Sequence, residues 1–165
     1  MAGARVVLVM GVAGSGKTTV GLRLAKQLGA AFLDADDLHP AANVAKMRAG
    51  HPLTDADRAP WLDAVAGWLD AHATGPAVVA CSALKRAYRD RIRRGRDGVA
   101  LVYLAASPAL VADRAAHRPG HYWPAALTQS QFDALEPPDA DEAAITVDAG
   151  GDLDATVDAV LARLG

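Results

Sequence analysis

The sequence predicts an α/β fold, a three-layer α/β/α sandwich in which helices cover both faces of a mostly parallel sheet. Five short runs are almost continuously apolar and do not alternate with polar residues, as is typical of parallel strands buried on both faces. Helical patterns lie between these runs, which indicates successive strand–helix units. The expected strands cover residues 6–10, 30–34, 77–82, 99–104 and 144–148.

The expected helices carry start and stop signals. The first one precedes Gly29, which stands where a left-handed glycine would end it. Thr54 and Asp57 have the spacing of a capping box. Ser107 and Pro108 are typical of an N-cap followed by a first helical residue. The expected helical segments cover 17–28, 54–73, 107–118 and 153–164.

The composition indicates one ordinary globular domain, residues 1–165. Apolar residues make up 52% of the chain and charged residues 22%, which excludes a disordered chain. The formal net charge of −2 gives no electrostatic reason to expect a nucleic acid partner. The arginine-rich stretch 85–96 is interrupted by Asp90 and followed by Asp97, so we interpret it as the solvated face of a helix.

The sequence also bears on the compartment. The single cysteine, Cys81, cannot form an internal disulfide and gives no sign of an oxidising compartment. The first residues lack the pattern of a signal peptide, and no apolar stretch approaches the roughly 20 residues of a membrane span. We therefore expect a soluble cytoplasmic protein without a membrane partner.

The stretch "GVAGSGKT" (11–18) matches the phosphate-binding pattern G-x-x-x-x-G-K-[ST]. An expected strand precedes it and an expected helix follows it, which disfavours a glycine-rich turn without a ligand. The glycines allow backbone N–H groups to surround an anion, Lys17 would reach the β- and γ-phosphates, and the Thr18 hydroxyl would bind Mg²⁺. We predict nucleotide contacts from Gly11, Val12, Ala13, Gly14, Ser15, Gly16, Lys17, Thr18 and Thr19.

The stretch "FLDADDLHP" (32–40) places three carboxylates after the second expected strand. If the chain stays extended, Asp34 and Asp36 point the same way and Asp37 points oppositely. Two acids that face one site could divide the work, one holding a metal ion and the other meeting a substrate hydroxyl. We expect Asp37 to cap or solvate a helix that begins near Pro40.

Two stretches, 35–76 and 105–143, are longer than a simple crossover and would grip ligands at the carboxyl ends of the strands. Arg114 and Arg118 are four residues apart and so share one side of a helix. They precede a region, about 118–136, that we interpret as a lid whose arginines approach the phosphates on closure. The alternative is a surface helix with two solvated arginines.

Small size and the absence of an N-K-x-D motif favour a small-molecule kinase over a GTPase. The chain resembles the small P-loop gluconate kinases (gluconokinases), relatives of shikimate and nucleoside monophosphate kinases. The stretches that carry the resemblance cover nearly the whole chain: "GVAGSGKT", "FLDADDLHP", "NVAKMRAGHPLTDADRAPWL", "CSALKRAYRD", "RPGHYWPAALTQSQFDALEPP" and "DADE".

The resemblance implies a P-loop NTPase fold with the strand order 2-3-1-4-5, a substrate-binding insertion at 35–76 and a homodimer. It also implies phosphorylation of D-gluconate at its 6-hydroxyl by ATP with Mg²⁺, giving 6-phospho-D-gluconate and ADP. By similarity, Asp34 belongs with Thr18 on the Mg²⁺ side and Asp36 orients the gluconate hydroxyl. Lys17, Asp36 and Arg118 are then the expected catalytic residues, and Arg114 and Arg118 the expected lid cations.

Further residues are candidates for binding the sugar acid. Arg58 is the best-placed partner for a carboxylate, because a guanidinium can bind it through two hydrogen bonds. The alternative for Arg58 is a surface ion pair with Asp55 or Asp57. Lys85 follows the third expected strand and Arg89 comes one helical turn later, so both are predicted to contact substrate or phosphate. His39 has polyol-binding potential, although a lone histidine is often structural.

Two other functions compete with this one. A kinase for another hydroxy acid, shikimate first, would share the phosphate loop and the paired acids. A nucleotide-sensing module without enzymatic activity would use the loop alone, and would leave the acids, the lid arginines and the insertion unexplained.

Overall fold

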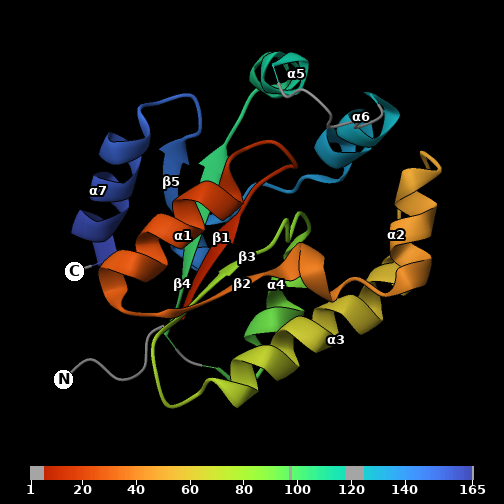
Figure 1. Cartoon of the computed structure of the whole chain (residues 1–165). Helices are drawn as coiled ribbons and strands as arrows, with labels where there is room; N and C mark the ends of the chain where they lie inside the picture. Colours follow the sequence, from red (N-terminus) through yellow and green to blue (C-terminus); the bar gives the residue numbers. More distant parts are fainter. Residues whose placement is uncertain (1–5, 97, 118–124, 165) are drawn as a thin grey trace.

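Five parallel strands form one sheet with the order β2-β3-β1-β4-β5, which confirms the predicted order. The structure, a computed structural model, describes residues 6–96, 98–117 and 125–164 (Figure 1). The order places the first strand between the third and the fourth, so that the loops after β1, β2 and β3 meet at one edge. The strands are β1 (Val6–Met10), β2 (Ala31–Asp34), β3 (Ala77–Ala80), β4 (Val99–Ala105) and β5 (Ile145–Asp148).

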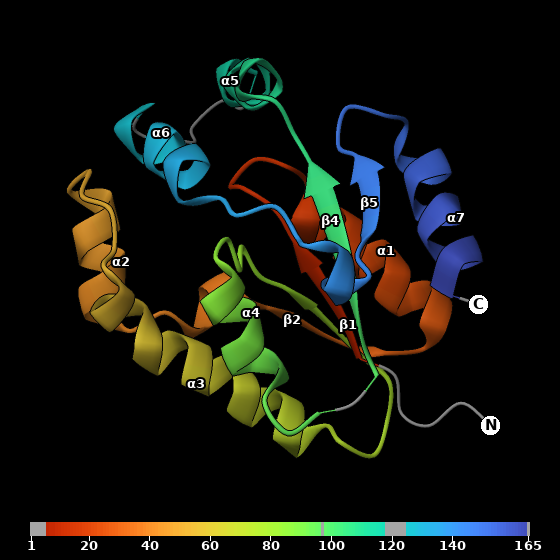
Figure 2. The ribbon, with the colours of Figure 1, turned by 180° about the vertical axis from the view of Figure 1, so that it is seen from behind.

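The helices form a layer on each face of this sheet. α1 and α7 cover one face, and α3 and α4 cover the other (Figures 1 and 2). α5 and α6 lie beyond the carboxyl ends of the strands, on the same side as the loop between β1 and α1. The helical segments are α1 (Lys17–Leu28), η1 (Ala35–Leu38), α2 (Ala41–Arg48), α3 (Asp55–Ala71), α4 (Arg86–Arg93), α5 (Pro108–Ala116), α6 (Ala125–Ala134), η2 (Ala140–Glu142) and α7 (Leu153–Leu164).

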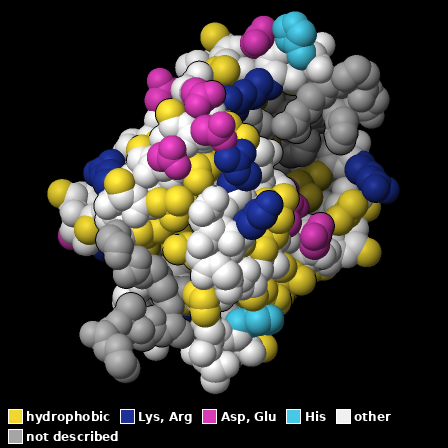
Figure 3. Space-filling view, turned by 60° about the vertical axis from the view of Figure 1, so that its left-hand side comes forward, with side chains coloured by type: hydrophobic (Ala, Val, Ile, Leu, Met, Phe, Trp, Pro, Cys, Tyr) yellow, Lys and Arg dark blue, Asp and Glu magenta, His cyan; other side chains and the backbone are white. Residues whose placement is uncertain are grey.

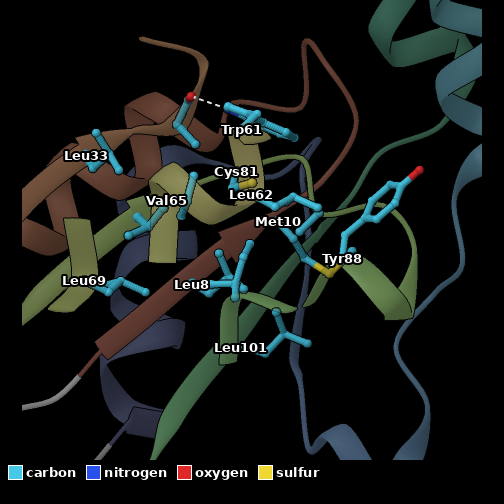
Figure 4. Packing of buried hydrophobic residues seen from close by; sticks show 14 of the residues in the cluster. Leu8, Met10, Leu33, Trp61, Leu62, Val65, Leu69, Cys81, Tyr88 and Leu101 are labelled. Carbon is cyan, nitrogen blue, oxygen red and sulfur yellow. Dashed lines mark hydrogen bonds between the residues drawn. The ribbon is translucent and has the colours of Figure 1, made fainter. Parts of the chain in front are cut away.

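The central strand explains why the apolar runs do not alternate. Leu8 and Met10 of β1 pack into the core beneath α3 and α4, and Val7 and Val9 pack into the core beneath α1 and α7. All four side chains are fully buried, since both faces of a parallel sheet are covered. Figure 4 shows the first of these cores, where Trp61 lies over the sheet and donates a hydrogen bond to a backbone carbonyl.

The predicted helix ends are confirmed. Gly29 ends α1 in a left-handed conformation with φ 62°. Thr54 and Asp57 form the capping box at the start of α3. The Ser107 side chain accepts from the N–H of Leu110, and Pro108 is the first residue of α5. Capping residues, which can be recognised in the sequence, therefore determine where these helices begin and end.

Two local expectations are wrong. The chain does not stay extended after Asp34: it turns at once into the 3-10 helix η1, whose N-cap is Asp34. The arginine-rich stretch is not simply a solvated helix face, because Tyr88, Arg89 and Ile92 on one side of α4 are buried. Both differences come from long-range packing, since Trp61 binds the backbone of η1 and the core beneath α3 takes up one side of α4.

The described surface carries mixed charge. On the face in Figure 3, basic side chains lie beside acidic ones and among apolar ones. Within residues 6–96, 98–117 and 125–164, no helix is long and apolar enough to cross a membrane.

Candidate active site

The loop between β1 and α1 has the shape of an anion cradle. Gly14 and Gly16 have φ values of 84° and 97°, which non-glycine residues rarely adopt. A Cβ atom added to Gly14 would also lie 3.2 Å from Cγ1 of Val111. The N–H of Ser15 donates to the Val12 carbonyl at 3.1 Å, which closes the loop. The first turn of α1 carries no acidic side chain, so its N-terminus favours a phosphate group.

Lys17 lies at the base of this loop. Its Nζ donates to the Val12 carbonyl at 3.2 Å, and its side chain is half-buried. Burial lowers the pKa of Lys17, and the negative charge of Asp36 opposes that effect. Phosphate groups in the cradle would add negative charge beside the ammonium group and so favour its charged form.

Thr18 and Asp34 meet at the edge where α1 and β2 adjoin. The Thr18 hydroxyl donates to Oδ2 of Asp34 at 2.9 Å. A hydroxyl and a carboxylate are oxygen ligands of the kind that Mg²⁺ prefers, so these two residues fit the magnesium ion that the fold implies. Among the described residues, His, Cys, Asp and Glu side chains form no group of three or more suited to hold a metal.

The Asp34 carboxylate also fixes its neighbour. Its Oδ1 accepts a hydrogen bond from the backbone N–H of Asp36 at 3.0 Å, as expected for an N-cap. Asp36 is exposed by surface area, but partial desolvation by the protein around its carboxyl raises its pKa, the charge of Lys17 lowers it, and the charge of Asp34 raises it further. The 3-10 turn therefore ties the backbone of Asp36 to the carboxylate of Asp34, where the sequence predicted an extended backbone. Asp37 lies exposed in the same turn and does not cap α2.

His39 is held by its surroundings. Its ring stacks on Trp61 with a centroid distance of 4.1 Å and an interplanar angle of 15°. Its Nδ1 lies 3.3 Å from Nδ2 of Asn43. Burial, together with the charge of Arg58, lowers the pKa of His39 to about 4, so the ring is neutral at pH 7. Trp61 in turn donates from Nε1 to the Ala35 carbonyl at 2.6 Å, so the stack and η1 share one support.

Arg114, one of the two predicted lid cations, reaches the phosphate loop from α5 and binds backbone carbonyls there. Its Nη1 donates to the carbonyls of Gly14 and Ser15 at 3.1 and 2.9 Å, and its Nη2 donates to the Ala149 carbonyl. Ser15, Arg114 and Ala149 border a cavity of about 420 Å³, the α5 pocket, whose lining also includes Thr19. The other predicted lid cation, Arg118, lies outside the described residues, as does the part of the predicted lid from 118 to 124.

A second cavity of about 460 Å³, the α3–α6 pocket, contains two of the predicted substrate cations. Nη1 of Arg58 donates to the Leu53 carbonyl at 2.8 Å and to the Tyr88 hydroxyl at 3.1 Å. Nζ of Lys85 pairs with Asp55 at 3.2 Å. The proposed alternative for Arg58, an ion pair with Asp55 or Asp57, is not formed. The pocket is lined by Pro52, Leu53, Thr54, Asp55, Arg58, Lys85, Ser130, Asp133 and Ala134.

Arg89, which the sequence placed among the substrate contacts, is instead part of the interior. Its side chain and that of Glu142 have 0% exposure, and Nε and Nη2 of Arg89 bind the two carboxylate oxygens at 2.7 and 2.9 Å. Nη1 donates to the carbonyls of Ala83 and Leu84. With its donors turned toward these partners and no exposed surface, Arg89 does not contact substrate but supports the loop that carries Lys85.

Several residues of the site were not predicted from the sequence. Oε1 of Gln131 accepts a hydrogen bond at 2.9 Å from the backbone N–H of Ala13, inside the phosphate loop. Ser130 and Asp133 line the α3–α6 pocket, and the Tyr88 hydroxyl bonds both Arg58 and Asp55. The complementary charges of the 85–96 and 139–142 stretches hinted at the Arg89 pair, but no sequence signal pointed to Gln131.

Known proteins resemble the chain over most of its length. A family model described as an AAA domain matches residues 6–138. The gluconokinase of Gluconobacter oxydans (strain 621H) is 49% identical over 87% of this chain and 82% of that protein. The thermosensitive gluconokinase of Escherichia coli (strain K12) is 47% identical over 86% of this chain and 76% of that protein.

Solved structures resemble it as well. The crystal structure of a gluconokinase from Sinorhizobium meliloti 1021 has a TM-score of 0.90 and 42% identity, and covers 99% of this chain and 93% of that one. A shikimate kinase from Acinetobacter baumannii has a TM-score of 0.63 and 21% identity, and covers 98% of this chain and 93% of that one. The latter likeness is one of fold alone.

The buried pair makes a prediction about stability. Glu142→Gln is expected to lower the free energy of unfolding by about 3–5 kcal/mol, because it leaves the buried Arg89 charge without a counter-charge. Denaturant unfolding followed by circular dichroism measures the change. Asp141→Asn is the matched control, since Asp141 pairs with Arg86 at the exposed surface and its loss is expected to have little effect. Equal effects of the two substitutions would contradict the structural role of the pair.

Proposed function

The chain belongs to the gluconokinase family, and we propose that its phosphate loop, its two adjacent acids and the α3–α6 pocket divide the work of phosphoryl transfer among them. The enzyme is a kinase that phosphorylates D-gluconate with ATP, at the 6-hydroxyl, giving 6-phospho-D-gluconate and ADP. The observation that carries the division of work is the contact of Thr18 with Asp34, and of Asp34 with Asp36, beside Lys17.

The phosphate loop is proposed to bind the nucleotide phosphates. Its backbone N–H groups and the N-terminus of α1 would surround the β-phosphate, and the ammonium of Lys17 would reach toward the γ-phosphate. Thr18 and Asp34 would hold Mg²⁺, which neutralises charge on the phosphate oxygens when it is bound. Arg114 and Thr19 border the α5 pocket beside the loop, so we assign that pocket to the rest of the nucleotide.

Asp36 is proposed to orient the attacking hydroxyl. Its backbone N–H is tied to Asp34, which restricts where its carboxylate can lie. Desolvation raises the pKa of its carboxyl, which makes it a better proton acceptor than an ordinary aspartate. The positive charge of Lys17 partly offsets this increase. Asp36 would accept the proton of the 6-hydroxyl as the bond between that oxygen and the γ-phosphorus forms and the bond to the β-phosphate oxygen breaks.

The α3–α6 pocket is proposed to bind the sugar acid. Arg58 and Lys85 supply two positive charges for a carboxylate, and Ser130, Thr54 and Asp133 supply polar groups for hydroxyls. The charge of Arg58 contributes to the lowered pKa of His39, which supports a position of this pocket near η1 and its acids. As a neutral ring stacked on Trp61, His39 would position η1 or bond a hydroxyl, not an anionic group. The homodimer and the cytoplasmic location remain predictions.

A substrate panel tests the function. ADP release in a coupled assay with ATP and Mg²⁺ is expected with D-gluconate and not with shikimate, and ³¹P NMR is expected to show a phosphomonoester at the 6-position. Lys17→Ala serves as the inactive control, with an expected loss of about 10³-fold or more in kcat. ADP release with shikimate but not with D-gluconate would contradict the proposal.

Substitution of Asp36 tests the proton acceptor. Asp36→Asn is expected to lower kcat by roughly 10²–10⁴-fold with little change in ATP affinity, because the amide cannot take up a proton. In the wild type, kcat is expected to fall as the pH drops through the raised pKa of Asp36, since the protonated carboxyl no longer accepts. Steady-state kinetics across the acidic range measures both effects. The next acid in the same turn offers a control, and an equal loss in Asp37→Asn would contradict the assignment.

Substitution of Arg58 tests the carboxylate anchor. Arg58→Ala is expected to raise KM for D-gluconate by roughly 10- to 100-fold, the effect of losing a hydrogen-bonded charge, while KM for ATP changes little. Arg48→Ala is the control, because Arg48 is exposed at the end of α2. Equal changes in the two KM values would rule Arg58 out as the anchor.

A further inference from the structure

α6 contacts the phosphate loop and the α3–α6 pocket at the same time. Gln131 reaches the loop, where Oε1 accepts from the Ala13 N–H at 2.9 Å across 118 residues of sequence. Ser130, Asp133 and Ala134 of the same helix line the pocket. Residues that touch two sites therefore stand next to one another on one short helix.

The end of α6 is anchored to both sites by packing as well. Phe132, Ala134 and Leu135 pack against a small buried cluster of Val12, Leu84 and Val111. Val12 belongs to the phosphate loop, and Leu84 immediately precedes Lys85 of the pocket. Glu136 lies two positions after the end of α6, and its N–H donates to the Leu84 carbonyl at 2.8 Å. A displacement of α6 thus cannot leave either site unchanged.

We propose that α6 couples the α3–α6 pocket to the phosphate loop, and that Gln131 is the positioning residue through which the coupling acts. The proposal rests on the proposed function, because it takes the pocket as the place where the sugar acid binds. A sugar acid that contacts Ser130 and Asp133 holds α6 in place. Gln131 then holds the Ala13 N–H, so the loop is already arranged for the nucleotide and less ordering remains when it binds.

The sign and size of the effect follow from this arrangement. Each ligand tightens the binding of the other by the same factor, because a coupling free energy is reciprocal. The coupling passes through one hydrogen bond between a backbone N–H and a side-chain oxygen, which accounts for a factor of roughly 2- to 10-fold in an equilibrium constant.

The experiment measures the coupling factor by isothermal titration calorimetry on the full chain. The Kd of D-gluconate is measured with and without a saturating non-hydrolysable ATP analogue and Mg²⁺, and the ratio of the two values is the factor. We expect a factor of roughly 2 to 10 for the wild type and a factor near 1 for Gln131→Ala. Gln27→Ala is the matched control, since Gln27 is an exposed glutamine on α1, and it is expected to keep the wild-type factor.

Gln131→Glu separates coupling from a merely structural role. Its carboxylate still accepts from the Ala13 N–H, so the factor is expected to be retained. Repulsion between the added charge and the phosphates weakens nucleotide binding equally with and without the sugar acid, and so it cancels in the ratio. A wild-type factor of 1, an unchanged factor in Gln131→Ala, or a factor lost equally in Gln131→Glu would overturn the proposal. Failure of the proposed function is recognised separately, as a wild-type protein that yields no phosphorylated D-gluconate.

Discussion

The buried ion pair between Arg89 and Glu142 is the interaction on which the arrangement of the site depends. A guanidinium without exposed surface must have its donors satisfied inside the protein, and Arg89 does so with one carboxylate and two carbonyls. Those carbonyls belong to Ala83 and Leu84, where the chain leaves β3 with Ala83 at a φ of 43°. A non-glycine residue in this region is strained, so the loop needs outside support, and the pair provides it.

The consequence is that residues far apart in the chain form one support. Glu142 lies in η2 just before β5, Arg93 adds a second guanidinium to its Oε1 at 2.8 Å, and the burial of Glu142 is thereby compensated. The hydrogen bond from Arg89 lowers the pKa of Glu142 to about 2, so the carboxylate is charged at neutral pH. The loop before Lys85, the end of α6 and the last strand are consequently held together without a contact to any ligand.

The features of this protein that depend on residues close together in the sequence were predictable. Apolar runs located all five strands, because burial on both faces leaves no polar positions, and caps such as Thr54 and Gly29 located helix ends. The phosphate loop followed from its own spacing. Arg89 and Gln131 did not, since their roles depend on partners 53 and 118 residues away. The 3-10 turn at Asp34 was also missed: Asp34 caps it locally, but Trp61, whose position depends on how α3 packs, also holds its backbone.

Lys17 and Asp36 carry opposite charges, and their pKa values depend on each other. Burial lowers the pKa of Lys17 and raises the pKa of Asp36, so it disfavours the charged form of each, and each charge favours the other. Nucleotide phosphates would strengthen the positive form of Lys17 and oppose the negative form of Asp36. A proton acceptor close to the phosphates is therefore made more basic by the substrate it serves, while Asp34 stays fixed by its hydrogen bonds to Thr18 and to the Asp36 backbone. The two acids can then act differently although they are only two residues apart, because the carboxylate of Asp34 is held by hydrogen bonds, whereas that of Asp36 responds to the charges around it.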